Sequence, residues 1–185
     1  MFAVCAVALL CLVSVSHSAP LACEDVARPL DQLDPLHLAG RWALVAGGMT
    51  DAAYLEKFKT RDSAAINYPN ASETPITSFT RSFNFNDSCQ HLQSNITLEG
   101  SGFIFHQYNI TVTFLYTSCP DCLLMRFDDE SKKPLRMYLF SRRRELEQKE
   151  IEEFSAQAKC LNMLPPASDM YSPERCTGVM HDQLN

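Results

Sequence analysis

From Arg41 to Arg142 the chain is a succession of short runs rich in β-branched and aromatic residues, each closed by a turn. The runs are Arg41–Thr50, Arg61–Tyr68, Ile76–Phe85, Cys89–Leu98, Phe103–Tyr108, Ile110–Ser118, Leu123–Asp128 and Leu135–Ser141. Strands spaced this regularly, with breaks such as Glu99-Gly100-Ser101-Gly102 between them, are typical of an antiparallel meander, barrel or sandwich. The sequence therefore predicts an all-β domain of eight strands.

The hydrophobic period changes after the last predicted strand. Ile151, Phe154, Ala158 and Leu161 recur at helical spacing in a stretch rich in Glu, Gln and Lys, from about 146 to 160. We predict one amphipathic helix there, packed outside the sheet, and a tail over 161–185 that Cys176 tethers. Between the first two strands, Asp51–Phe58 fits either a short helix or a lid-like loop.

The N-terminus is expected to direct secretion. Phe2–Val15 is almost unbroken apolar sequence, and Ser16 and Ser18 place small residues at positions −3 and −1 of a cleavage site after Ser18. Such a run is too short to span a bilayer comfortably and ends like a signal peptide. We predict a signal peptide over 1–18, one mature domain over 19–185 and no transmembrane segment.

The mature cysteines are even in number, which in an extracellular chain indicates a disulfide framework. They are Cys23, Cys89, Cys119, Cys122, Cys160 and Cys176. Cys119-Pro-Asp-Cys122 resembles half a zinc site or a redox motif, but no matching Cys or His pair follows and no βαβ pattern surrounds it. Pro120 suits a type I turn, whose ends lie within about 7 Å, so a disulfide bracketing the turn is the better interpretation. No metal site is predicted.

Four Asn-x-Ser/Thr sequons follow the predicted signal peptide, so we expect a glycoprotein. The acceptors are Asn70, Asn86, Asn95 and Asn109. The formal net charge of −6 and the absence of a basic stripe argue against a nucleic-acid partner.

A glycan must face solvent, so Asn95 and Asn109 are expected to point outward. Because side chains alternate between the two faces of a strand, residues an odd number of positions away, such as Leu92 and Ile110, are expected to point inward. With the one-sided phenylalanine row around Arg81, the candidate ligand-contacting residues are Phe79, Arg81, Phe83, Phe85, Ile96, Leu98, Val112, Phe114 and Tyr116. Periodicity does not distinguish a packed core from a lined cavity. Arg81 is the only charge on its row, and it either meets an anionic head group or turns to the rim.

Asp34-Pro35-Leu36-His37-Leu38-Ala39-Gly40-Arg41-Trp42 resembles the opening of the lipocalin family, where Gly40 and Trp42 match the Gly-x-Trp motif. Arg142 matches the arginine of the family's last strand, which packs across that tryptophan. The middle Thr-Asp-Tyr motif is not recognisable. Within the family the chain is most similar to the branch with α1-acid glycoprotein, apolipoprotein M and the fish tributyltin- and saxitoxin-binding lipocalins, over Leu36–Gly47, Thr117–Met125 and Met137–Asn162.

The resemblance implies an eight-stranded antiparallel up-and-down barrel over about 40–142, with the helix outside and Trp42 and Arg142 as structural residues at the closed end. It implies disulfides Cys23–Cys160 and Cys89–Cys176, which leaves Cys119–Cys122. The implied function is that of a secreted plasma carrier. Its ligand would be small and hydrophobic or amphipathic: a lipid, steroid, drug, or toxin such as an organotin or alkaloid.

Two other functions stay open. One is an immunomodulatory, acute-phase-type glycoprotein that acts through surface contacts. The other is an enzyme like the prostaglandin-isomerising lipocalins, which need a free cysteine; here every mature cysteine has a proposed partner. We therefore predict no catalytic residue and no cofactor. The expected protein is a monomer, for which lipoprotein particles or a cell-surface receptor are further candidate partners.

Overall fold

The structure, a computed structural model, describes residues 22–60, 63–70, 78–85, 88–105, 108–143 and 145–168. The predicted signal peptide, the sequon asparagine Asn86 and the tail cysteine Cys176 lie outside these residues. In the part of the chain that is described, no helix has the length and apolar character needed to cross a membrane.

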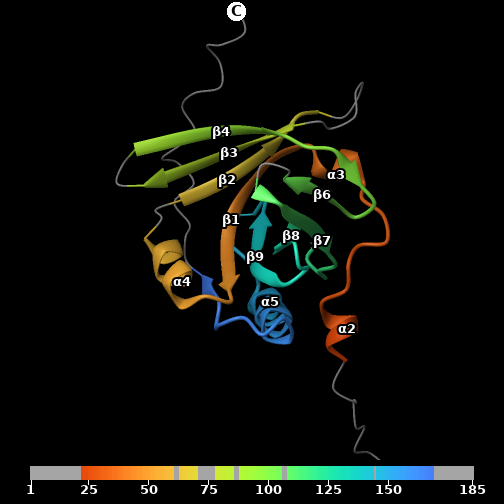
Figure 1. Ribbon diagram of the computed structural model, residues 1–185, viewed down its shortest axis with the longest axis vertical. Helices are drawn as coiled ribbons and strands as arrows, with labels where there is room; N and C mark the ends of the chain where they lie inside the picture. The colour runs from red at the N-terminus through yellow and green to blue at the C-terminus, as the bar shows by residue number, and fades with distance from the viewer. Residues whose placement is uncertain are drawn as a thin grey trace, which may run out of the picture.

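A single antiparallel sheet of ten strands forms most of the domain (Figure 1). The strands are β1 (Gly40–Met49), β2 (Ser63–Tyr68), β3 (Ser78–Phe85), β4 (Ser88–Asn95), β5 (Leu98–Glu99), β6 (Gly102–Phe105), β7 (Ile110–Leu115), β8 (Cys122–Asp128), β9 (Pro134–Ser141) and β10 (Ala167–Ser168). The sheet order is β4-β3-β2-β1-β9-β8-β7-β6-β5, with β10 paired to β1 beside this path. Sequence neighbours pair from β1 to β4 and again from β5 to β9, and β1 pairs with β9, which confirms the predicted up-and-down fold class.

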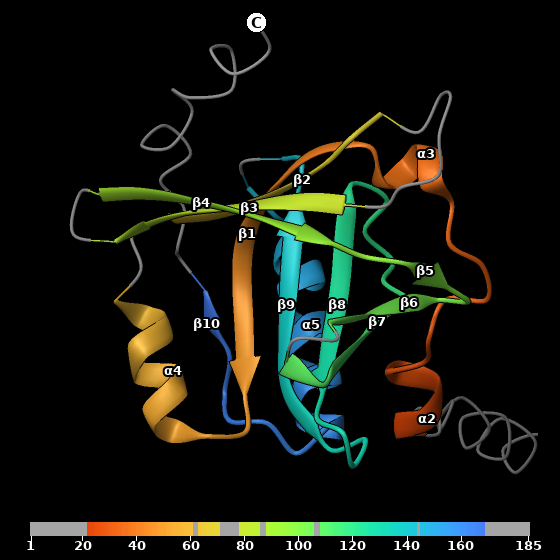
Figure 2. The ribbon, with the colours of Figure 1, turned by 45° about the horizontal axis from the view of Figure 1, so that its top comes forward.

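The sheet curls on itself (Figure 2). The two strands at its ends, β4 and β5, follow one another directly in the chain. Among the described residues no backbone pairing joins β4 to β5 or β6. Side chains hold this seam, because Phe79 of β3 packs against Phe103 and Phe105 of β6 with ring centroids 5.5 Å apart in both cases. The predicted run Cys89–Leu98 is accordingly two strands, which are separated by Ile96 and Thr97, and the Ile96 side chain is buried.

Within the described residues, four helices accompany the sheet: α2 (Cys23–Val26), α3 (Pro35–Leu38), α4 (Ala52–Lys59) and α5 (Gln148–Cys160). The predicted C-terminal helix is α5, and it lies on the outer face of the sheet (Figure 2). The segment that fitted either a helix or a loop is helix α4. It begins at the N-cap Asp51, whose carboxylate accepts a hydrogen bond from the backbone N–H of Tyr54 at 2.9 Å.

Strand β8 and the second half of β9 are buried on both faces, which explains their nearly continuous apolar sequences. In β9, Phe140 packs into the interior of the curled sheet, whereas Met137 and Leu139 pack towards α5. Helix α5 covers this outer face with Phe154 and Ala158, which are fully buried. The domain therefore has one apolar cluster inside the sheet and a second one between the sheet and α5.

A partly buried ion pair between Arg143 and Glu150 fixes the start of α5. The Glu150 carboxylate accepts hydrogen bonds from the backbone N–H of Glu147 at 2.8 Å and from Arg143 Nη2 at 2.6 Å. Burial by itself would raise the pKa of Glu150, but these two donors outweigh it and hold the pKa below its ordinary value. Arg143 Nη2 also lies 3.0 Å from Cys119 Sγ, so the pair ties the Cys119–Cys122 turn to the helix.

The N-terminal segment packs against the end of β7, and one predicted residue at this end lies differently from the expectation. The backbone N–H of Tyr116 donates to the Arg28 carbonyl at 2.9 Å, and the Arg28 guanidinium carbon lies 4.3 Å from the centroid of the Tyr116 ring. Tyr116 was expected to face inward, but it is 41 % exposed. The expectation is wrong because β7 ends at Leu115, so the alternation no longer applies to the next residue.

Tyr68 is fully buried and its hydroxyl has no hydrogen-bond partner among the described residues. Burial raises the pKa of this hydroxyl. An unpaired buried hydroxyl costs about 1–3 kcal/mol, so Tyr68→Phe should increase the free energy of unfolding by about 1 kcal/mol. Urea denaturation of both proteins checks this, and a loss of stability on removing the hydroxyl would show that it has a partner after all.

Candidate ligand-binding site

One end of the curled sheet is closed around Trp42, which is fully buried. Its indole N–H donates to the Leu38 carbonyl at 2.8 Å, and the Arg142 guanidinium carbon lies 4.2 Å from the ring centroid. Arg142 Nη2 also donates to the carbonyls of His37 and Ala39 at 2.7 Å. The guanidinium therefore fastens α3 to the end of β9 across the indole, which is the arrangement that the family resemblance implies.

Gly40 makes the sharp entry from α3 into β1. Its φ of +96° lies in the region where a Cβ atom is disfavoured, and an added Cβ would otherwise meet nothing within 4 Å. Backbone conformation, not lack of space, requires glycine here.

The half of the interior next to Trp42 is filled by aromatic side chains. Tyr68 stacks on Phe79 with ring centroids 5.3 Å apart, and Phe103 lies 5.9 Å from Phe114. Three of the predicted inward residues, Ile96, Val112 and Phe114, are buried in this cluster, and Leu98 packs against it half-buried. In this half, the predicted rows are therefore packed core.

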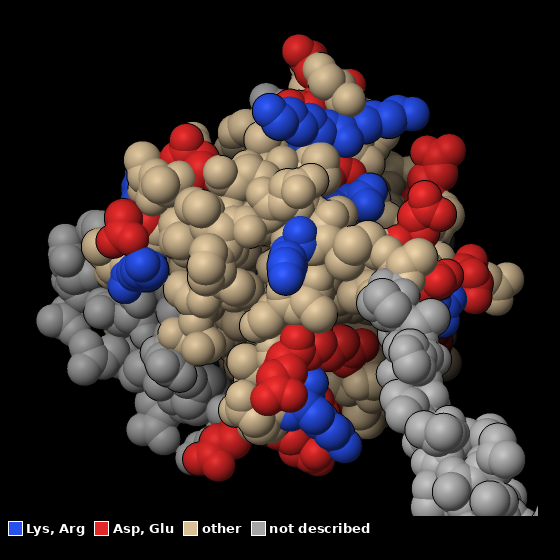
Figure 3. Space-filling model, turned by 90° about the horizontal axis from the view of Figure 1, so that it is seen from below, with Lys and Arg blue, Asp and Glu red and all other residues tan. Residues whose placement is uncertain are grey.

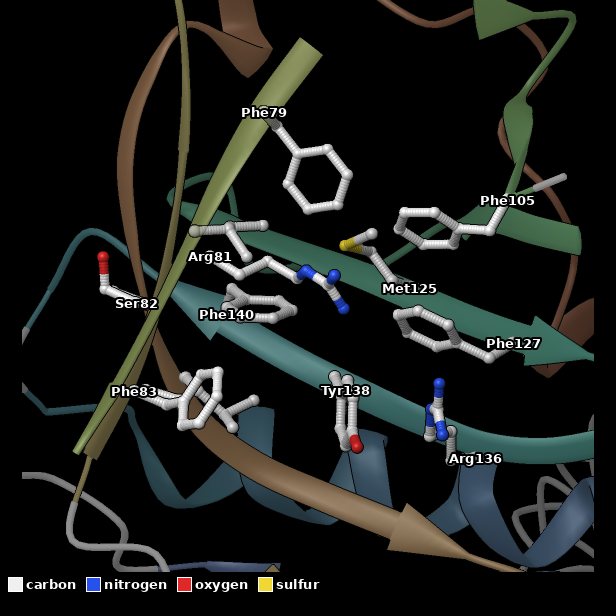
Figure 4. Close-up of a pocket in the computed structure, with 14 residues that line it drawn as sticks. Phe79, Arg81, Ser82, Phe83, Phe105, Met125, Phe127, Arg136, Tyr138 and Phe140 are labelled. Carbon is white, nitrogen blue, oxygen red and sulfur yellow. The ribbon is translucent and has the colours of Figure 1, made fainter. Parts of the chain in front are cut away.

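A cavity of about 150 Å³ lies further along, between the middle parts of β1, β2, β3, β8 and β9 (Figure 4). We call it the inner cavity. It is lined by Leu44, Ala64, Ala65, Ile66, Phe79, Arg81, Ser82, Phe83, Phe105, Met125, Phe127, Arg136, Tyr138 and Phe140. Its wall is thus apolar and aromatic apart from two guanidinium groups, Tyr138 and Ser82.

The two guanidinium groups of the inner cavity belong to Arg81 and Arg136. Within the described residues, neither Arg81 nor Arg136 forms an ion pair, and the Nε–H of each is buried without a hydrogen-bond acceptor. Arg81 Nη2 donates to Ser94 Oγ at 3.1 Å, and its guanidinium carbon lies 5.4 Å from the Phe105 ring centroid. Burial lowers the pKa of Arg81, the charge of Arg136 lowers it further, and Tyr108 and Tyr138 oppose the change.

A second and larger cavity, of about 400 Å³, lies at the open end of the sheet. We call it the mouth cavity. The residues that line it come from the end of β1, from α4 and from the starts of β7 and β9: Met49, Thr50, Asp51, Tyr54, Lys57, Phe58, Ile110, Leu135, Arg136 and Tyr138. Arg136 and Tyr138 line both cavities, so these two side chains form the boundary between them.

Helix α4 is seated on the sheet by Phe58. This ring stacks on Tyr138 with centroids 5.5 Å apart and an interplanar angle of 11°. It lies directly over Gly47, where any Cβ atom would overlap it. The absence of a side chain at Gly47 therefore lets Phe58 reach Tyr138 and form part of the wall of the mouth cavity.

Of the predicted ligand-contacting residues, Phe79, Arg81 and Phe83 line the inner cavity. The Phe85 side chain lies outside what the structure describes. Leu92 shares the Arg81 face of the sheet because it pairs with Arg81 across β3 and β4, but it is 44 % exposed on this edge strand.

The prediction missed Arg136 and Tyr138, which the structure places at the centre of the site. A signal for them was available. They alternate with Phe140 along the last strand, two residues apart, in the pattern that identified the row around Arg81.

The structure contains disulfides between Cys23 and Cys160 and between Cys119 and Cys122, the pairs proposed from the sequence. Cys89 is also disulfide-bonded, and its expected partner Cys176 falls outside the described residues. Asn70, Asn95 and Asn109 are exposed, as acceptors of glycans must be. Their glycosylation, and that of Asn86, stays a prediction.

The described residues contain no group of three or more His, Cys, Asp or Glu side chains placed to hold a metal ion. On the face seen in Figure 3, most charged side chains of both signs lie towards the edges, and a basic side chain stands by itself within the broad tan area between them. The chemistry that the site offers is the burial of apolar surface together with two guanidinium groups that have no acidic partner among the described residues.

A comparison with known protein families matches residues 29–168 to the ApoM domain. A comparison with curated proteins finds no match. Among solved structures, the chain is similar to the siderocalin Ex-FABP, described as functioning through dual ligand specificities. The two share 17 % sequence identity and a TM-score of 0.58, over 71 % of this chain and 93 % of that one. At this identity the likeness shows a common fold.

Proposed function

The chain belongs to the ApoM domain family of lipocalins, and from this premise we propose that it carries a small hydrophobic or amphipathic ligand in the open half of its curled sheet. The observation that carries the proposal is the pair of adjoining cavities, of about 150 and 400 Å³, with largely apolar and aromatic walls. Ligand sites in proteins are commonly concave, mostly apolar and about 300–1,000 Å³ in volume.

The driving force would be the burial of apolar surface. A ligand that hides about 300 Å² of such surface gains roughly 7 kcal/mol before the costs of association, at about 25 cal/mol per Å². This corresponds to an affinity in the micromolar range at best unless polar contacts add to it. A carrier of this kind binds reversibly and needs no catalytic group.

The disulfides and the family support an extracellular location, and we propose that the protein is secreted through the signal peptide at 1–18. Its exposed sequon asparagines are suited to glycosylation. A plasma role and an association with lipoprotein particles or a receptor are further predictions from the resemblance.

The proposal is tested by titrating delipidated protein with an uncharged fluorescent probe that emits in apolar surroundings. We expect saturable binding at one site, with a micromolar dissociation constant and displacement by other apolar compounds. If no uncharged apolar probe binds, the carrier function is wrong, and an action through surface contacts becomes the better hypothesis.

A further inference from the structure

We propose that the outer edge of strand β4 is a surface on which two copies of this chain pair, and that an N-glycan on Asn95 prevents this pairing in the glycosylated protein. The partner is a second copy of β4 in antiparallel orientation, so that the sheet of one copy continues into the sheet of the other. This inference goes beyond the carrier function, and it rests on the glycosylation predicted for Asn95.

Strand β4 is the last strand of the sheet on its side. The sheet order begins with β4, and β3 is its neighbour (Figure 1). Within the part of the chain that the structure describes, no strand pairs with the outer edge of β4. Seven of its eight residues are exposed, and the other one, Ser94, is half-buried. The backbone N–H and C=O groups along this edge therefore form a template for a further strand.

The β4 edge is long and regular. It pairs with β3 at eight consecutive positions, from Phe85 with Ser88 to Ser78 with Asn95, and the register does not shift between them. Natural proteins commonly protect an edge strand by short length, by a bulge, by proline or by charged side chains, lysine above all. Between Ser88 and Asn95 the sequence contains no proline and no Asp, Glu, Lys or Arg. None of these four features therefore protects β4.

The strand at the opposite end of the sheet is protected by its length. Strand β5 consists of Leu98 and Glu99 alone, and Glu99 is an exposed charge. Its neighbour β6 has only four residues. Strands this short offer few backbone groups to an incoming chain. Of the two end strands, β4 is thus the one that needs another form of protection.

The sequon asparagine Asn95 occupies the last position of β4, and its side chain is exposed. Leu92 shares the Arg81 face of the sheet, on the inner side. Asn95 lies three residues further along, so the alternation of side chains places it on the outer face. An N-glycan is bulky and solvated, and at this position it would occupy space beside the end of the edge that an incoming strand requires.

A second copy of β4 fits this edge when the two strands cross at Leu92, near the middle of each strand. Leu92 is 44 % exposed, so two such side chains that meet across the strands remove apolar surface from water. The other side chains brought together are uncharged polar groups or His91, so the pairing opposes no like charges at neutral pH. In this register, Asn95 of each copy lies opposite the start of β4 in the other copy. A glycan on either copy therefore obstructs the pair.

The first experiment measures the oligomeric state of the full mature chain, produced by secretion from eukaryotic cells, with the occupied sequons identified by peptide mapping. Sedimentation velocity should show glycosylated wild type as a monomer as its concentration is raised. After enzymatic removal of the N-glycans, the average mass should rise with concentration towards that of a dimer. Thr97→Ala, which removes the sequon but keeps Asn95, should also associate. Ser72→Ala, the matched loss of the Asn70 sequon, should stay monomeric.

The second experiment tests the surface itself with Gln93→Lys. In the pair centred on Leu92, the two residues at position 93 are diagonal neighbours, about 7–8 Å apart, so two lysines there repel each other within a Debye length. Gln148→Lys, at an exposed position of α5, is the matched control because it changes the net charge equally. After removal of the glycans, Gln93→Lys should be monomeric and Gln148→Lys should associate as wild type does. Thermal melting verifies that every variant is folded.

Each alternative result overturns a stated part of the proposal. Deglycosylated wild type that stays monomeric at every concentration would show that β4 is no pairing surface. Association that Gln93→Lys leaves unchanged would place the contact on another part of the molecule. An unoccupied Asn95, or a Thr97→Ala protein that stays monomeric while fully deglycosylated wild type associates, would refute the role of the Asn95 glycan. The carrier function is measured separately, by titration with the uncharged probe, and does not depend on these results.

Discussion

Replacing Trp42 with alanine is expected to lower the free energy of unfolding by about 3–5 kcal/mol, as for other large-to-small changes in a packed core. The side chain is fully buried, its N–H satisfies the Leu38 carbonyl, and the Arg142 guanidinium packs on its ring. Alanine would leave a cavity, an unpaired carbonyl and a cation without its aromatic partner. Urea denaturation followed by circular dichroism measures the loss without relying on tryptophan emission.

Arg142→Lys is a milder change at the same closed end of the sheet, for comparison with Trp42→Ala. Lysine keeps the charge but lacks the planar group that covers the indole and donates to both His37 and Ala39, so we expect a smaller loss of about 1–2 kcal/mol. Both variants should still bind an apolar probe at temperatures where they are folded. A Trp42→Ala protein of wild-type stability that binds no probe would place the ligand at this end and reverse the orientation described here.

Removing the Cys23–Cys160 disulfide should have the second large effect. The bridge spans 137 residues and joins α2 to the end of α5. In the chain-entropy model, a loop of this length stabilises the fold by about 5 kcal/mol, and measured losses for native disulfides are commonly about 2–5 kcal/mol. The Cys23→Ala, Cys160→Ala double variant should therefore unfold at much lower urea concentration than wild type.

The Cys119→Ala, Cys122→Ala double variant is its control. These cysteines are only three residues apart, and a loop so short contributes about 2 kcal/mol in the same model. Both cysteines are buried, so their replacement by alanine also removes some packing. This extra loss acts against the expected difference in stability between the two double variants. Equal losses from the two double variants would show that loop length does not decide the contribution of these bridges.

The sequence predicted the order and faces of the strands well wherever a strand is regular over its whole length. The period of two identified Phe79, Arg81 and Phe83 as one inward row, and all three line the inner cavity. The helical period likewise identified the face of α5 that carries Phe154 and Ala158. These patterns are local, and a regular backbone preserves them.

The sequence could not show where the interior is empty. Phe114 and Phe83 have the same character in the sequence, yet Phe114 is packed among other rings and Phe83 lines a cavity. The difference depends on how side chains from distant strands meet. Tyr116 was misplaced for a related reason, since the end of β7 is set by pairing with the N-terminal segment around Arg28. Periodicity within one strand contains neither kind of information.

The central claim, that this protein carries a small ligand within its curled sheet, is tested most directly by native mass spectrometry of protein purified from its own source. We predict a species heavier than the denatured, glycosylated chain by the mass of one small molecule, which is released on unfolding and rebinds to the delipidated protein. Native and denatured masses that agree in every preparation, together with delipidated protein that binds no apolar compound, would contradict the account.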